Sequence, residues 1–175
     1  MRIFYIILLL LVSSCSDHTI NSYSGEEPKL NLREFFDGYI YALGIVQDRS
    51  GKVIKRFKVD IKAYWEGEKA ILDEKFIYSD GKKSSRVWEI NEIGRSKYEG
   101  RANDVVGIAT GETAGNTFYF EYDLDLLVGD TTYKVNFEDW MYLLDEKTLL
   151  ARSYMNKWGF DLGEVTIVMN KREKN

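Results

Sequence analysis

The stretch that decides the fold is Val53–Trp65, which reads VIKRFKVDIKAYW. From Phe57 to Trp65 the odd positions hold apolar side chains, and the even positions from 56 to 62 hold Arg, Lys, Asp and Lys. Side chains of a strand point alternately to its two faces, whereas a helix repeats about every 3.6 residues. This stretch therefore predicts a strand with one buried and one solvated face.

The same alternation continues along the chain on both sides of that stretch. It is clearest at residues 118–128 (FYFEYDLDLLV) and 133–143 (YKVNFEDWMYL), with shorter runs at 70–78, 88–90 and 165–169. Turn-forming pairs that include glycines 51, 67, 81 and 94 separate the runs, and no gap is long enough for a crossover helix. We expect eight to ten strands, with sequence neighbours paired as hairpins.

An all-β fold with these properties has two economical architectures. An up-and-down antiparallel barrel removes every sheet edge, and we take it as the leading prediction, with a two-sheet sandwich as the alternative. The faces opposite the apolar residues are charged, which excludes a barrel that spans a membrane, because its outer face must be apolar. The segment Leu30–Phe36 fits either one short helical turn or an extended lead-in.

Three charged residues lie on faces that are otherwise apolar. Glu74 shares a face with Leu72 and Phe76, Arg86 shares one with Trp88, and Asp139 falls within the third run. A charge inside a barrel must be paired or solvated. These residues therefore predict a structural ion pair, a polar spot that orients the head group of a ligand, or a pair of catalytic carboxylates.

Glycines are frequent between residues 98 and 115, inside expected strands. Gly100, Gly107, Gly111 and Gly115 are spaced every four to seven residues, and their pattern matches neither a dinucleotide fingerprint nor a phosphate loop. Glycine within a strand marks a bulge or a close approach of backbone. The segment predicts either tight curvature of the barrel or space left for a ligand.

The N-terminus has the pattern of an export signal. Arg2 is followed by ten apolar residues, Ile3–Val12, which span about 15 Å as a helix and are too short to cross a bilayer. The order Val12-Ser13-Ser14-Cys15 resembles a bacterial lipobox, in which cleavage exposes a cysteine that receives a lipid anchor. We expect a signal peptide at 1–14 and lipidation of Cys15. By the same resemblance, Ser16 favours the outer membrane, facing the periplasm.

The rest of the chain divides around this anchor. Residues 15–30 are polar, contain His18 and Pro28, and predict a lipidated cysteine with a flexible tether. The barrel domain is expected at 31–171 and a polar tail at 172–175.

Composition excludes several classes of chemistry. The 175 residues include one Cys and one His, which argues against an internal disulfide, a zinc site or a histidine-based catalytic triad. The net charge of −4 argues against a nucleic-acid partner. We therefore expect no metal and no cofactor, and a membrane partner reached through Cys15.

Several segments together resemble the uncharacterised bacterial lipoprotein family catalogued as domain of unknown function 3833. The segments are Phe35-Phe36-Asp37-Gly38, Glu74-x-Phe76-x-Tyr78-x-Asp80-Gly81, Arg86-x-Trp88, Gly100-x-Ala102-x-Asp104-Val105-x-Gly107, Asp139-Trp140-Met141 and Arg152-x-x-Met155-x-Lys157-x-Gly159. A lipobox followed by one barrel is also similar to the lipocalin and calycin group, whose members hold hydrophobic ligands. The resemblance implies such a barrel and brings no established activity.

These patterns lead to three functional hypotheses. The first is an anchored barrel that binds a lipid or another small hydrophobic molecule. The second is a structural or interaction module of the cell envelope with a filled core, and the third is an enzyme acting on envelope lipids or glycans. The candidate ligand contacts are Glu74, Arg86, Trp88, Asp104, Asp139 and Trp140.

Overall fold

A computed structural model describes residues 19–128 and 130–172. Two short helical segments come first, η1 (Ile20–Tyr23) and α1 (Leu32–Phe35). Ten strands follow: β1 (Gly38–Asp48), β2 (Val53–Glu66), β3 (Lys69–Tyr78), β4 (Lys83–Gly94), β5 (Lys97–Arg101), β6 (Val105–Ala114), β7 (Thr117–Val128), β8 (Thr131–Leu143), β9 (Thr148–Lys157) and β10 (Phe160–Lys171). The predicted signal peptide and Cys15 lie outside the described residues.

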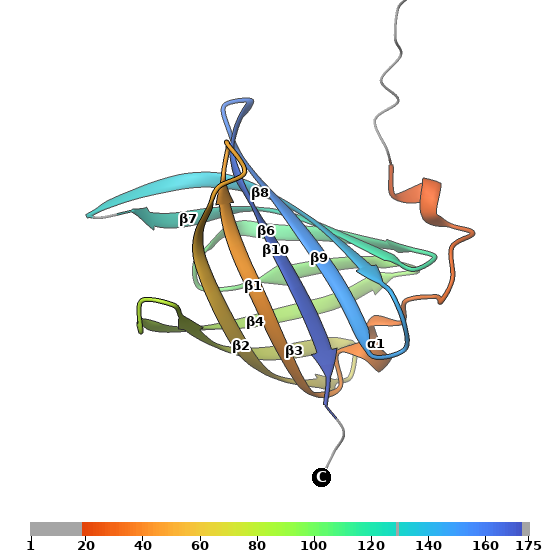
Figure 1. The fold of residues 1–175 in the computed structure, drawn as a ribbon. Helices are drawn as coiled ribbons and strands as arrows, with labels where there is room; N and C mark the ends of the chain where they lie inside the picture. The colour runs from red at the N-terminus through yellow and green to blue at the C-terminus, as the bar shows by residue number, and fades with distance from the viewer. Residues whose placement is uncertain (1–18, 129, 173–175) are drawn as a thin grey trace, which may run out of the picture.

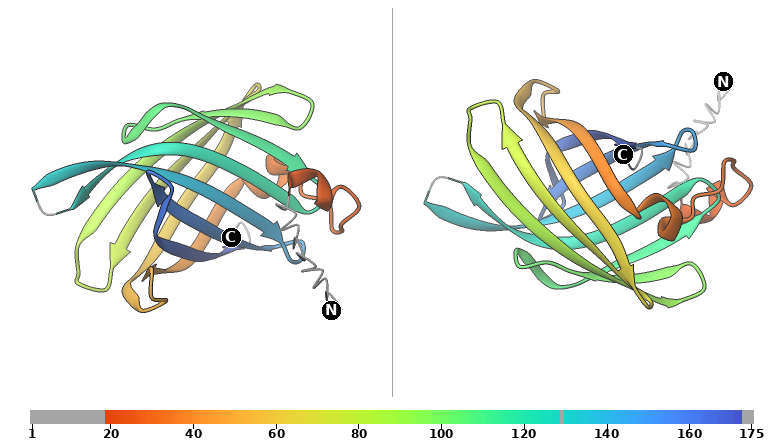
Figure 2. Two further views of the ribbon diagram at one scale, coloured as in Figure 1. Left: turned by 90° about the horizontal axis from the view of Figure 1, so that it is seen from above. Right: turned by 90° about the horizontal axis from the view of Figure 1, so that it is seen from below.

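The ten strands form one closed antiparallel barrel. Each strand pairs with its neighbours in sequence, and β1 pairs with β10 to complete the ring. Figure 1 shows the strands running obliquely around the barrel, and Figure 2 shows the barrel from above and from below. The predicted up-and-down barrel is confirmed, and the sandwich alternative is wrong, because hydrogen bonding continues around the whole ring.

The alternation that predicts the strands also builds the core. In β2 the odd positions Val59, Ile61 and Ala63 are buried, while the even positions between them face solvent. Directly paired residues share a face, so Leu72 of β3 and Trp88 of β4 continue the same interior surface. One apolar face per strand is enough to fill the barrel because all ten strands curve around one interior.

Two of the strand glycines leave room for aromatic rings of β7. A Cβ on Gly100 would lie 2.4 Å from Cζ of Phe120, and a Cβ on Gly111 would lie 2.6 Å from Cε2 of Phe118. The space at these two glycines is therefore taken by the protein's own side chains and not left for a ligand. Gly107, with φ of +79°, lies where the β6–β7 register shifts, which agrees with a role in curvature.

Helix α1 closes one end of the barrel. Its N-cap residue Asn31 accepts hydrogen bonds from the backbone of Arg33 and Glu34 through its side chain, which stabilises this single turn. Leu32 and Phe35 are buried against the ends of the strands, and Phe36 follows them into the core. The short helical turn that Leu30–Phe36 allowed is confirmed.

The described part of the predicted tether lies against the barrel instead of standing free. The ring of Tyr23 packs 6.0 Å from that of Trp140 and 5.5 Å from that of Tyr142. The backbone N–H of Leu30 donates to the carbonyl of Gly115, and Leu30 is buried. The prediction of a flexible tether rests on the polar composition of this segment. The contact with the barrel is made by Tyr23 and Leu30, two of its few apolar residues.

No helix in the described residues is long and apolar enough to cross a membrane.

Candidate functional site

The two ends of the barrel differ in how tightly they are packed. Near α1 the inward side chains are almost inaccessible, as Ile40, Phe118 and Leu149 show. At the opposite end, which we call the mouth, inward-facing apolar residues remain partly exposed. The mouth residues are Val46, Phe76, Tyr78, Leu126 and Val165. The mouth is therefore the less tightly packed end of the barrel.

The wall of the barrel is incomplete on one side of the mouth. Strand β5 has only five residues, and its pairing with β4 begins at Glu89. Within the described chain, β4 residues 83–88 pair only with β3, which leaves a notch beside the β5–β6 turn. Arg86 spans this notch: its Nε and Nη2 donate to Oδ2 of Asp104 at 3.0 and 2.6 Å.

This ion pair belongs to a group of polar side chains inside the barrel. We call this group the polar cluster: Glu74, Arg86, Asp104, Tyr122, Asp139 and Ser153. Glu74 is the register partner of Arg86, and Ser153 is the register partner of Asp139. The hydroxyl of Tyr122 donates to Oδ2 of Asp139 at 3.1 Å.

Two carboxylate oxygens of the polar cluster have no hydrogen-bond partner within the described chain. They are Oδ1 of Asp104 and Oδ1 of Asp139, and both atoms are buried. Buried carboxylate oxygens are normally satisfied, because leaving one unpaired costs about 1–3 kcal/mol or more. With three carboxyl groups against one guanidinium, the cluster has more acceptors than it has donors.

Burial changes the protonation of these carboxyls. It raises the pKa of Glu74 to about 7, with Arg86 opposing that rise and Asp139 adding to it. Burial also raises the pKa of Asp139 to about 6, against hydrogen bonds from Ser153 and Tyr122 that lower it. The pKa of Tyr122 lies well above its ordinary value, because burial and then Asp139 disfavour the phenolate.

The structure brings four of the six predicted contacts together. Glu74, Arg86, Asp104 and Asp139 belong to the polar cluster. Trp88 points inward on the same strand as Arg86, with its ring 5.2 Å from that of Phe120 and 5.1 Å from that of Tyr122. It therefore forms the apolar floor beneath the cluster.

Trp140 is not part of this site. It lies on the outer face of β8, pairs with Tyr119 and Arg152, and is covered by Tyr23 of η1. Its neighbour Asp139 points inward, so the alternation along the strand sends Trp140 outward. Its burial comes from the segment before α1 and not from the barrel interior.

Sequence reasoning missed Tyr122 and Ser153. Tyr122 stands in the predicted alternation of residues 118–128, so its inward direction could be read from the sequence. Its contact with Asp139 depends on the register in which β7 faces β8, where Phe120 is opposite Asp139. No pattern within one strand specifies that register.

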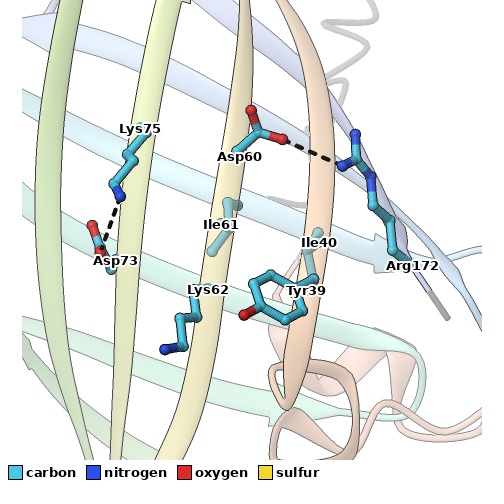
Figure 3. Close-up of a pocket in the computed structure, with 8 residues that line it drawn as sticks. All are labelled: Tyr39, Ile40, Asp60, Ile61, Lys62, Asp73, Lys75 and Arg172. Carbon is cyan, nitrogen blue, oxygen red and sulfur yellow. Dashed lines mark ion pairs between the residues drawn. The ribbon is translucent and has the colours of Figure 1, made fainter. Parts of the chain in front are cut away.

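Two hollows in the described chain lie outside the barrel interior. One, of about 250 Å³, crosses the outer face of β1, β2 and β3, where Asp60 pairs with Arg172 and Asp73 with Lys75 (Figure 3). The other, of about 330 Å³, lies near α1 and Pro28. Neither hollow contains a residue of the polar cluster. The first is lined by exposed ion pairs, which contribute little to stability.

Comparison with known proteins identifies the family. A model of the family described as a protein of unknown function, DUF3833, matches residues 9–171. The chain belongs to this family. No curated protein matches it. Among solved structures, this DUF3833 chain is similar to the S-type phycobiliprotein lyase CPES from Guillardia theta, with a TM-score of 0.58 and 10% identity over 90% of this chain and 100% of the other.

That structural likeness concerns the fold. At 10% identity it shows that the DUF3833 chain shares the barrel fold of that structure. Within the described residues, no group of three or more His, Cys, Asp or Glu side chains is placed to hold a metal ion.

Proposed function

We propose that this protein is a lipid-anchored lipoprotein of the bacterial cell envelope that binds a lipid or another small hydrophobic molecule at the mouth of its barrel. The observation that carries the proposal is the polar cluster, which lies within an apolar interior that is less tightly packed at one end. Small-molecule sites combine an apolar lining with a few polar groups that fix orientation.

The lining of the mouth suits such a ligand. Phe57, Phe76 and Tyr78 form an aromatic wall with ring centroids about 6 Å apart, and Leu126 and Val165 face the same opening. Met155 near the mouth and Met141 toward the α1 end also face the interior, and methionine side chains are flexible enough to adapt to different shapes. The α1 end is closed, so a ligand enters through the mouth or the notch.

The anchor and the location rest on the sequence. The lipobox-like order that ends at Cys15 supports attachment to a membrane, and Ser16 supports the outer membrane, with the barrel in the periplasm. Several acyl chains on one cysteine hold a protein on a bilayer firmly.

Native mass spectrometry of the full-length protein, purified from cell envelopes, tests ligand binding. We expect a bound small molecule in the wild type and its loss in Leu126→Trp, which fills the mouth. The matched control is Leu127→Trp, because Leu127 is the outward-facing neighbour and is 68% exposed. An empty wild-type barrel, or equal retention by both variants, would contradict binding at the mouth.

A second candidate function is an interaction module of the envelope. The closely packed interior near α1 favours it, together with exposed apolar residues at the tip of the β9–β10 hairpin, Trp158 at 87% and Phe160 at 72% exposure. In the same purification this function would give protein partners and no small molecule, with binding lost when the hairpin tip is altered.

A further inference from the structure

The polar cluster restricts the kind of head group that the mouth can accept. Arg86 is its only cation, and both of its hydrogen bonds within the described chain go to Asp104. A ligand with a carboxylate or phosphate would compete with Asp104 for that guanidinium. It would also approach Glu74 and Asp139, whose charges repel it.

The unpaired oxygens favour the opposite kind of ligand. Asp139 is only 7% exposed and faces inward, and its Oδ1 accepts no hydrogen bond from the described chain. Asp104 presents a second buried oxygen of the same kind beside the notch. Both atoms accept hydrogen bonds and cannot donate them while the carboxyls are ionised. A group with N–H donors would satisfy them.

The arrangement also gives such a ligand an orientation. The hydroxyl of Tyr122 holds Oδ2 of Asp139, which leaves Oδ1 as the open acceptor of this carboxyl. Trp88 forms the apolar floor, and the aromatic wall of the mouth lies toward solvent. An amphiphile would place its nitrogen at the carboxylates and its hydrocarbon along the mouth.

We propose that the mouth selects hydrophobic molecules that carry a protonated amine, with Asp139 as the main acceptor and Asp104 as the second. This inference rests on the proposed function and specifies the chemical class of its ligand. Hydrogen bonds to an ionised partner are about twice as strong as neutral ones. The preference over a matched neutral or anionic head group is therefore expected to be about tenfold or more.

Calorimetric titration of the full-length protein with three ten-carbon amphiphiles tests the inference. The probes are decylammonium, decanol and decanoate, used near pH 7.5, where an alkylammonium is protonated. We expect decylammonium to bind about tenfold more tightly than either of the other two. Asp139→Asn should remove most of this preference and leave decanol affinity within about twofold, because the amide keeps the shape and loses the charge.

The control variant is Asp73→Asn, which removes a carboxylate from the outer face of β3 and should change none of the three affinities. Where Asp139→Asn does not fold, Asp104→Asn provides the same comparison, read against decanol. Decanoate binding as tight as decylammonium, or a preference that survives both variants, would overturn the inference while the binding function stands. Failure of all three probes to bind would overturn both.

Discussion

Because Glu74 is buried, its protonation makes the stability of the barrel depend on pH. Its pKa rises to about 7 because the side chain is buried, so the folded protein holds this proton more tightly than the unfolded chain does. Unfolding between about pH 4.5 and 7 then releases a proton, and the free energy of unfolding falls as pH rises. Asp139 acts in the same direction between about pH 4 and 6.

We therefore predict that the protein is more stable at pH 5 than at pH 8. Glu74→Gln should raise the free energy of unfolding at pH 8 by about 2 kcal/mol and reduce its dependence on pH, since the variant has no buried charge at position 74. Urea unfolding followed by circular dichroism at several pH values measures both effects. Asp73→Asn, on the outer face, is the control, and a stability that rises from pH 5 to 8 would contradict the prediction.

At the residue scale, the alternation along a strand predicts whether a side chain points into or out of the barrel, but not which residues it contacts. Glu74, Arg86 and Asp139 point inward, as their places in the strands predict. The same rule places Trp140 outside, and grouping it with the interior contacts ignored that parity. The contact between Arg86 and Asp104 could not be predicted from the sequence, because Asp104 lies in a turn, where alternation no longer determines where a side chain points.

At the scale of elements, the strands could be predicted and the segment before them could not. The structure has ten strands in its described residues, within the expected eight to ten. The number could be predicted because apolar and polar residues alternate within the local sequence of each strand. The packing of η1 depends on one tyrosine that meets the outer face of β8, far along the chain. A polar composition says little about such a contact.

The contribution of η1 can be measured through Tyr23. Tyr23→Ala should lower the free energy of unfolding by about 1 kcal/mol, because aromatic pairs contribute about 0.5–1.5 kcal/mol beyond simple burial. It should also expose Trp140, which is 6% exposed with Tyr23 in place, and shift tryptophan emission to longer wavelength. Tyr39→Ala, at a position that is already 53% exposed, is the control. An unchanged emission spectrum would show that η1 does not cover Trp140 in solution.

At the scale of the whole molecule, closure makes the strands depend on one another. β10 pairs with β9 on one side and with β1 on the other, so its removal opens two edges at once. The sequence predicts a closed barrel because closure leaves no strand edge unpaired. The strand patterns alone do not identify which strands pair to close it.

We expect a chain that ends at residue 159, and so lacks β10, to lose cooperative unfolding altogether instead of forming a smaller barrel. Without β10 the core near Met169 and Ile167 opens to water, and unpaired strand edges favour aggregation. Thermal unfolding and hydrogen exchange distinguish the outcomes. Removal of residues 173–175 alone should leave the melting curve unchanged. A sharp transition in the shorter chain would contradict this expectation.

The pairing of the first strand with the last also sets an order in time. While the chain is being made, β1 emerges early and then waits for a partner that is synthesised more than 110 residues later. During that interval the nascent chain has a hydrophobic face and a free edge, but no means of enclosing them. We therefore expect the unfinished chain to depend on protection by the cell until its last strand is complete.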